Sequence, residues 1–62
     1  MEPKLYKLEI YSGGALLFYV GRRQTLDNAR REARYIIKQR NEAVSVDIWN
    51  TETNTFVERI VP

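Results

Sequence analysis

The chain of 62 residues contains neither cysteine nor histidine. The absence of cysteine excludes disulfide bonds and thiolate metal sites, and the absence of histidine removes the commonest general base and an imidazole metal ligand. A small domain that has neither disulfides nor a structural metal depends on the packing of its apolar side chains or on self-association. We therefore expect either a hydrophobic core that suffices for folding or a surface through which the chain associates with itself.

Long apolar segments are also lacking. No run approaches the ~20 apolar residues that a membrane-spanning helix needs. The N-terminal sequence "MEPKLYKLEI" does not have the basic-then-apolar order of a signal peptide. We expect a cytoplasmic protein without a membrane partner, folded as one domain over residues 1–62. A domain of this size buries only roughly 60% of the surface that its unfolded chain exposes, so its core must be thin.

Charge is distributed unevenly along the chain, although the net charge is only +2. Residues 22–40 carry seven basic and two acidic side chains, a net charge of +5. The remaining residues carry three basic and six acidic side chains, a net charge of −3. The sequence therefore predicts one basic segment on an otherwise slightly acidic molecule.

The first third of the chain has the pattern of a β-hairpin. Apolar residues alternate through "KLYKLEIY" (residues 4–11), "SGG" follows as a turn, and "ALLFYV" (residues 15–20) reads as a second strand. Gly13 or Gly14 can close the turn, because glycine tolerates positive φ angles.

The length of the turn decides which side of the second strand is buried. A three-residue loop sets Ile10 beside Leu16 and Leu8 beside Phe18, whereas a two-residue loop pairs Ile10 with Leu17. The three-residue loop is favoured, because it gathers apolar residues on one face and leaves the mixed set of Tyr11, Leu17, Tyr19, Lys7 and Glu9 on the other.

Residues 25–40, "TLDNARREARYIIKQR", have the features of an α-helix. Thr25 is a suitable N-cap, Asp27 lies in the first turn where the helix dipole favours an anion, and Asn41 can adopt a left-handed conformation after the last turn. A stripe about 100° wide is expected to face the core. Its members are Leu26, Ala29, Ala33, Ile36, Ile37 and Arg40.

Two further strands, "AVSVDIW" and "TFVERIV", are joined by a turn over residues 50–54. Asn50 can start this turn by accepting backbone hydrogen bonds, and Asn54 can take the left-handed position that closes it. This register places Trp49 beside Phe56. A regular continuation makes Asp47 and Glu58 cross-strand neighbours, and burying two adjacent carboxylates is costly. We therefore expect the Trp49 face to lie outside, and the face with Val44, Val46 and Ile48 to be the core.

The sequence thus predicts an α+β domain with ββαββ order, in which one helix covers one face of a four-stranded sheet. This order resembles that of β-grasp domains over the whole chain. The resemblance implies that the first and last strands lie parallel at the centre of the sheet. It implies no function, since such folds carry many unrelated activities.

Catalysis has little support in the sequence. Asp47 and Glu58 form the nearest approach to a carboxylate pair, but no histidine, third ligand or glycine-rich phosphate loop accompanies them. We expect a non-enzymatic protein with no cofactor, no metal and no small-molecule substrate.

Two surfaces are candidates for binding instead. The helix-free face of the sheet is expected to bind a protein partner or a second copy of the chain, since aromatic and aliphatic residues rimmed by charges are typical of interfaces. The residues predicted for this surface are Trp49, Phe56, Ile60, Leu17, Tyr19 and Tyr11.

The alternative is a nucleic-acid-binding surface on the basic flank of the helix, where cations would contact phosphates and an aromatic ring would stack on a base. The competing interpretation is an ordinary solvated face, because arginine and lysine are good helix formers and Asp27 can pair with Arg31. The residues predicted for nucleic acid are Arg22, Arg23, Arg30, Arg31, Arg34, Lys38 and Tyr35.

Overall fold

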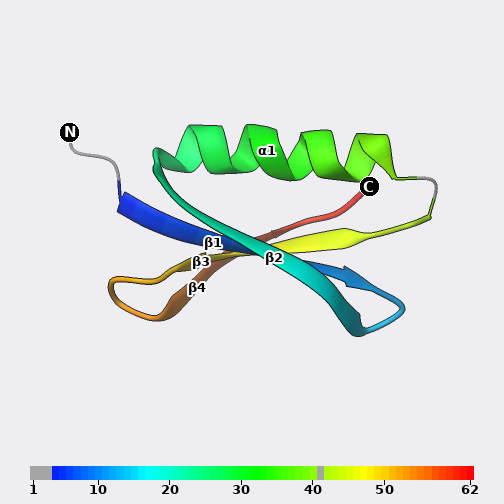
Figure 1. Ribbon diagram of the computed structural model, residues 1–62, viewed down its shortest axis with the longest axis horizontal. Helices are drawn as coiled ribbons and strands as arrows, with labels where there is room; N and C mark the ends of the chain where they lie inside the picture. The colour runs from blue at the N-terminus through cyan, green and yellow to red at the C-terminus, as the bar shows by residue number, and fades with distance from the viewer. Residues whose placement is uncertain (1–3, 41) are drawn as a thin grey trace.

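The computed structural model describes residues 4–40 and 42–62 of the chain. Four strands and one helix follow one another in the predicted ββαββ order (Figure 1), so the predicted α+β class is confirmed. The elements are β1 (Lys4–Ser12), β2 (Ala15–Gln24), α1 (Leu26–Gln39), β3 (Ser45–Asn50) and β4 (Thr55–Ile60).

The sheet has the strand order β2-β1-β3-β4, and every neighbouring pair is antiparallel. The arrangement implied by the β-grasp resemblance is therefore wrong, because β3 rather than β4 lies beside β1. The reason lies in the two strand sequences. Val46 and Ile48 of β3 are fully buried, whereas β4 carries Glu58 and Arg59. Charged side chains suit an edge strand, and the apolar strand takes the centre.

Helix α1 covers one face of the sheet (Figure 1) and lies over β1, β3 and β4. Its start is capped as predicted, since the backbone N–H of Asn28 donates to Thr25 Oγ1 at 3.2 Å. Ala29 and Ala33 are fully buried, and such small side chains allow the helix to approach the strands closely. The predicted position of Asn41 lies outside the described residues.

One member of the predicted helix stripe is not in the core. Arg40 is exposed just after the last helical residue, where its guanidinium stacks over the ring of Phe18 at 5.4 Å. Its Nη2 also lies 2.7 Å from Glu42 Oε1. A permanently charged group remains in solvent because burial would remove its hydration. The other members do face the sheet.

The core lies between α1 and the inner face of the sheet. Side chains from β1 and β3 alternate in and out, and the helix contributes its small residues. This confirms the facing predicted for both strands. The buried apolar residues are Tyr6, Leu8, Ile10, Ala29, Ala33, Val44, Val46 and Ile48.

Both predicted turns form, but the favoured three-residue loop of the first hairpin is wrong, because Ser12 pairs with Ala15 and the loop has the two residues of the alternative. Gly13 and Gly14 have φ angles of 59° and 83° and make a two-residue hairpin turn. In the second turn, the Oδ1 of Asn50 accepts hydrogen bonds from the backbone N–H groups of Glu52 and Thr53. Asn54 takes the left-handed conformation with φ of 55°.

The first hairpin contains a register shift that the sequence analysis did not foresee. Ile10 pairs with Phe18 and Leu8 with Val20, while Tyr11 pairs with Leu16. Leu17 is therefore an extra residue in β2. Both predicted registers are wrong, although Phe18 and Val20 do share the face of Ile10 and Leu8. Leu16, predicted to face the core, instead shares the face of Tyr11.

The second hairpin also contains a bulge. Trp49 pairs with Phe56 and Asn50 with Thr55, as predicted. Beyond this point the pairs are Ile48 with Glu58, Asp47 with Arg59 and Val46 with Ile60, so that Val57 is the extra residue. The extra residue reverses the facing of the second half of β4. Glu58 and Ile60 therefore lie on the helix side, which corrects their predicted position on the outer face.

Ile48→Ala should lower the free energy of unfolding by about 2–5 kcal/mol, because it leaves a cavity in a core that has few other side chains to fill it. Val61→Ala, at an exposed position after β4, is the control and should change the stability by less than about 0.5 kcal/mol. Chemical denaturation of both variants measures the difference. Equal losses of stability would contradict the facing assigned to β3.

Candidate interaction surfaces

The sheet has a face that α1 does not cover, which we call the open face. Its composition follows from the strand pairings, since residues directly opposite one another point to the same side. Two rows of residues cross this face: Gly21, Lys7, Trp49 and Phe56 in one, and Tyr19, Glu9, Asp47 and Arg59 in the other.

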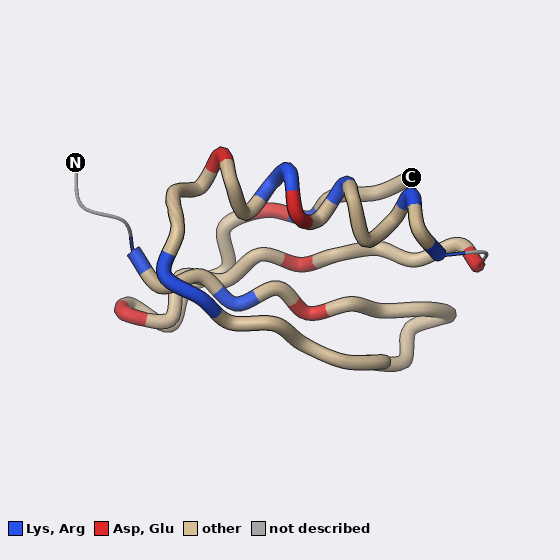
Figure 2. The backbone as a smooth tube through the Cα atoms, turned by 45° about the horizontal axis from the view of Figure 1, so that its top comes forward, with Lys and Arg blue, Asp and Glu red and all other residues tan. Residues whose placement is uncertain are grey.

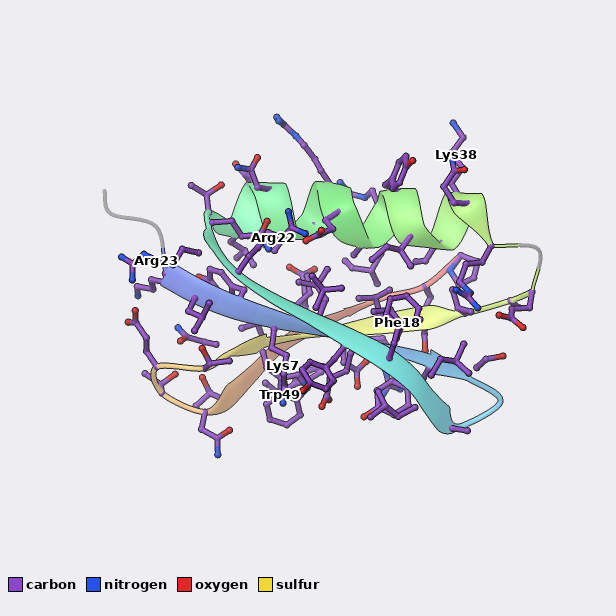
Figure 3. All side chains as sticks on the ribbon, in the orientation of Figure 1. Lys7, Phe18, Arg22, Arg23, Lys38 and Trp49 are labelled. Atoms are coloured by element: carbon purple, nitrogen blue, oxygen red, sulfur yellow. The ribbon has the colours of Figure 1, made fainter. Side chains whose placement is uncertain are left out.

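Trp49 and Phe56 form an aromatic pair on the open face, with ring centroids 5.7 Å apart and an interplanar angle of 79°. Half of the Phe56 surface is exposed, but Trp49 is only partly exposed. Its indole Nε1 is shielded from solvent and has no acceptor among the described residues. Lys7, the cross-strand neighbour of Trp49, lies alongside it (Figure 3). The solvent-exposed surface of this ring pair therefore consists mainly of Phe56 and part of the Trp49 indole.

The charges on the open face are paired with one another. Arg59 donates from Nε to Asp47 Oδ1 at 2.7 Å and from Nη2 to Oδ2 at 3.2 Å. This bidentate bond raises the pKa of Arg59 and neutralises an Asp47 side chain that is only 8% exposed. Lys7 Nζ lies 3.3 Å from Glu9 Oε2. The supposed pair of Asp47 with Glu58 does not exist, because the two carboxylates lie on opposite faces.

Glu9 also accepts a hydrogen bond from the Tyr11 hydroxyl at 3.1 Å. Desolvation of the phenol and this hydrogen bond to an anion raise the pKa of Tyr11, since both favour its protonated form. Tyr11 is thereby fixed beside the charged row, with its ring partly exposed.

The structure brings most of the predicted open-face residues together. Tyr11, Tyr19, Trp49 and Phe56 share this face, and Tyr19 is the most exposed of them at 67%. Ile60 does not belong, because the bulge in β4 turns it towards the core.

The bulge in β2 changes the surface near the first hairpin. Leu17 is exposed there, and Leu16, which the sequence analysis placed inside, is 49% exposed beside Tyr11. The unbroken apolar run "ALLF" was a possible signal, since strict alternation cannot place four consecutive apolar residues on one side.

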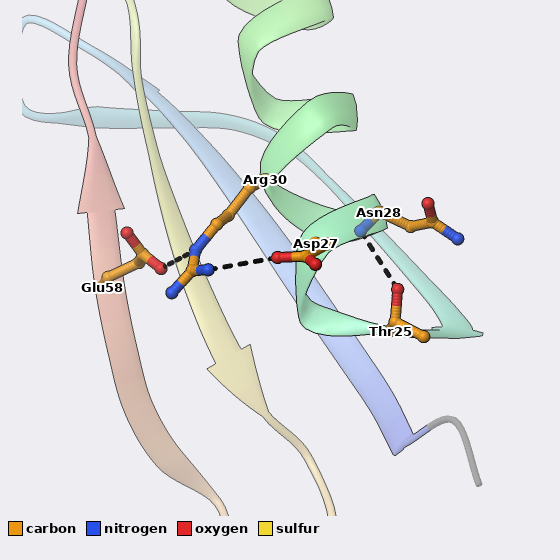
Figure 4. Close-up of polar contacts among 5 residues, drawn as sticks. All are labelled: Thr25, Asp27, Asn28, Arg30 and Glu58. Carbon is orange, nitrogen blue, oxygen red and sulfur yellow. Dashed lines mark hydrogen bonds and ion pairs between the residues drawn. The ribbon is translucent and has the colours of Figure 1, made fainter. Parts of the chain in front are cut away.

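The predicted basic surface divides into paired and unpaired cations. Arg22 and Arg23 lie within β2 rather than at the start of the helix, and Arg22 Nη2 is 3.1 Å from Glu32. Arg30 bridges from the helix to β4 by binding Glu58, and it also pairs with Asp27 at 3.3 Å (Figure 4). These two acids raise the pKa of Arg30, with the hydrogen bond to Glu58 as the largest cause.

Three cations, Arg31, Arg34 and Lys38, lie on the solvent side of α1. Together with the exposed Tyr35, we call them the helix strip. Asp27 pairs with Arg30, so its predicted pairing with Arg31 is not seen. Basic positions recur along the helix (Figure 2), and the labelled Lys38 points away from the sheet (Figure 3). Within residues 4–40 and 42–62, the cations of the strip form no ion pair.

No cluster of three or more acidic side chains in the described part of the chain is arranged to hold a metal ion. The same residues include no helix with the length and hydrophobicity needed to span a membrane. Comparison with protein-family models, curated proteins and solved structures finds no match for this chain. The two surfaces themselves are therefore the features that indicate a function.

Arg59→Met should lower the free energy of unfolding by about 1–3 kcal/mol, because it leaves the buried Asp47 carboxylate without its partner. In an Asp47→Asn background the same change should cost less, since no buried charge is then stranded. A double-mutant cycle by chemical denaturation measures the coupling. Equal costs in the two backgrounds would show that the ion pair does not stabilise the open face.

Proposed function

We propose that this protein is a non-enzymatic interaction module that binds a second copy of itself, or a partner protein, through the open face. The observation that supports this most directly is the exposure of Tyr19 and Phe56 beside charges that are already paired within the face. Exposed aromatic rings are enriched at the centre of protein interfaces, where they are commonly the residues that contribute most to affinity.

A second copy is the occupant that the charges favour. Lys7, Glu9, Asp47 and Arg59 sum to zero, and each is neutralised by a neighbour on the same face. Two such faces can meet without like-charge repulsion, whereas a strongly charged partner would find no excess charge to complement. A partner protein with a neutral apolar surface is the other possible occupant.

The size of the face sets the expected strength of this association. The four strands have nine, ten, six and six residues and lie about 4.8 Å apart, so the face is roughly 20 Å across the strands and about 20 to 30 Å along them. This is small beside the ~800 Å² that each partner buries in a standard interface. We therefore expect an association that depends on protein concentration.

Replacing both Trp49 and Phe56 by alanine should convert the dimer to a monomer, or abolish binding of the partner. Loss of about 2 kcal/mol for each ring would weaken the association roughly 30-fold per ring. Sedimentation velocity over a concentration series measures the change, and circular dichroism checks that the helix and the sheet persist. The fluorescence of Trp49, the single tryptophan, should shift to longer wavelength on dilution of the wild type.

Tyr35→Ala is the matched control, because it removes an exposed aromatic ring from the opposite side of the molecule. It should leave the association unchanged. A wild type that remains monomeric at millimolar concentration and binds no partner protein would refute the proposal, as would equal effects of the control and the double substitution.

The helix strip supports a second candidate function, binding of nucleic acid. The specific observation is that its three cations have no acidic partner among the described residues, although most other cations do. Arg31, Arg34 and Lys38 are three and four residues apart, so they lie on one side of the helix. Phosphates could neutralise them while Tyr35 stacks on an unpaired base.

Changing Arg31, Arg34 and Lys38 to glutamine should abolish binding of a mixed single-stranded oligonucleotide. If weak binding persists, the slope of log K against the logarithm of the salt concentration should become less steep by about 2 to 3. The control changes Lys4, Lys7 and Arg40 to glutamine, which removes the same charge from other places. Fluorescence anisotropy at several salt concentrations compares the two. Equal losses would assign the effect to net charge rather than to the strip, and a wild type that binds no oligonucleotide at low salt would eliminate this function.

A further inference from the structure

The two edge strands of the sheet differ in how well they are protected against pairing with another chain. An edge strand carries unpaired backbone N–H and C=O groups, and proteins shield such edges with charges, bulges, prolines or a covering element. Strand β4 has six residues, a bulge at Val57, the charged residues Glu58 and Arg59 on opposite faces, and the Arg30 bridge to the helix. It is therefore protected along most of its length.

Strand β2 is longer, with ten residues, and its protection is confined to its two ends. The bulge at Leu17 interrupts the first part, and Arg22 with Arg23 occupies the last part. The four residues 18–21 between them include no charge and no proline. They form a regular antiparallel stretch with one edge paired to β1, and among the described residues no strand lies at the other edge.

The helix leaves this stretch incompletely covered. Helix α1 lies over β1, β3 and β4, so Phe18, which packs against the edge of the core, and Val20 remain partly exposed on the helix side of β2. Arg40 stacks on Phe18, but within residues 4–40 and 42–62 no further strand lies beyond β2 in the sheet. A further strand added at this edge would bury both side chains as well as satisfy the backbone groups.

We propose that β2 of one molecule pairs antiparallel with β2 of a second copy, about a two-fold axis within residues 18–21. The antiparallel direction is required by two-fold symmetry and also separates the basic ends of the strands. In a parallel arrangement Arg22 and Arg23 would lie beside the same residues of the other copy. In the antiparallel arrangement they lie beside the uncharged start of the partner's strand.

This inference goes beyond the proposed function, because it uses the edge of the sheet and not the open face. Pairing places the side chains of residues 18–21 against the same apolar stretch of the other copy, on both sides of a continuous eight-stranded sheet. The two helices then lie on the same side of that sheet. The open faces of the two copies become adjacent on the other side and stay accessible.

Single-cysteine variants test the axis directly, because the natural chain contains no cysteine. Tyr19→Cys and Gly21→Cys, both on the open face, come within disulfide range of the same position in the other copy when the axis passes close to them. Gly21 accepts a side chain, since the nearest atom to an added Cβ is 4.0 Å away. Glu52→Cys, at the exposed turn between β3 and β4, is the control for random collision.

Under mild oxidation, at least one of the two β2 variants, or an equimolar mixture of both, should form disulfide-linked dimers at least tenfold faster than Glu52→Cys, because an axis at Val20 sets residue 19 opposite residue 21. Amide hydrogen exchange supplies the second measurement on the unmodified chain. The outward-pointing amides of residues 18–21 should exchange more slowly at millimolar than at micromolar protein concentration. The exchange rate should fall by a factor of about ten when the protein concentration is ten times the dissociation constant of the dimer.

The same exchange measurement on the variant with Trp49 and Phe56 changed to alanine separates the two interfaces. Protection of the β2 amides should persist there even when binding through the open face is lost. Exchange rates in β2 that do not depend on concentration would overturn the edge proposal while leaving the open-face proposal intact. Cross-linking no faster than that of Glu52→Cys, for each β2 variant alone and for an equimolar mixture of the two, would exclude an axis at residues 19–21 and would also overturn it.

Discussion

A single helix must cover the apolar side of a four-stranded sheet in this protein, and this constraint shapes the surfaces on both sides. Fourteen residues make a helix about 21 Å long and roughly 10 Å across, which is narrower than four strands spaced about 4.8 Å apart. The helix lies over β1, β3 and β4. Polar bridges extend its reach, through Glu32 to Arg22 on one side and through Arg30 to Glu58 on the other. The remaining apolar surface has to be tolerated in water or buried by another molecule.

The open face shows how much of that surface the chain protects by itself. Asp47 would be a costly charge in the middle of a sheet, but the bidentate bond from Arg59 neutralises it, and Lys7 does the same for Glu9. The pair of Asp47 with Arg59 depends on the bulge at Val57, because a regular register would place Glu58 rather than Arg59 opposite Asp47. The aromatic rings that flank the pairs have no such protection, so they are what a partner would cover.

Local chemistry was the part of the structure that the sequence predicted well, because it depends on neighbouring residues only. The cap at Thr25 and the turn residues Asn50 and Asn54 acted as expected. The bulges were not predicted, since one extra residue in a strand leaves the composition unchanged but reverses the facing of all that follows. That is why Ile60 was assigned to the wrong side. Strand order was also missed, although the charges in "TFVERI" indicate an edge strand.

The two proposed contacts are geometrically compatible, because they use different symmetry axes. Pairing through β2 needs a two-fold axis perpendicular to the plane of the sheet. Stacking of two open faces needs a two-fold axis that lies between the two sheets and parallel to their planes. Where two such axes meet at right angles they generate a closed assembly of four chains, with two sheets face to face about 10 Å apart and the helices outside. In that assembly Tyr19 and Phe56 are covered by the facing sheet and residues 18–21 by the neighbouring strand. The helix strip takes part in neither contact and stays in solvent, so the proposed binding of nucleic acid is compatible with this assembly.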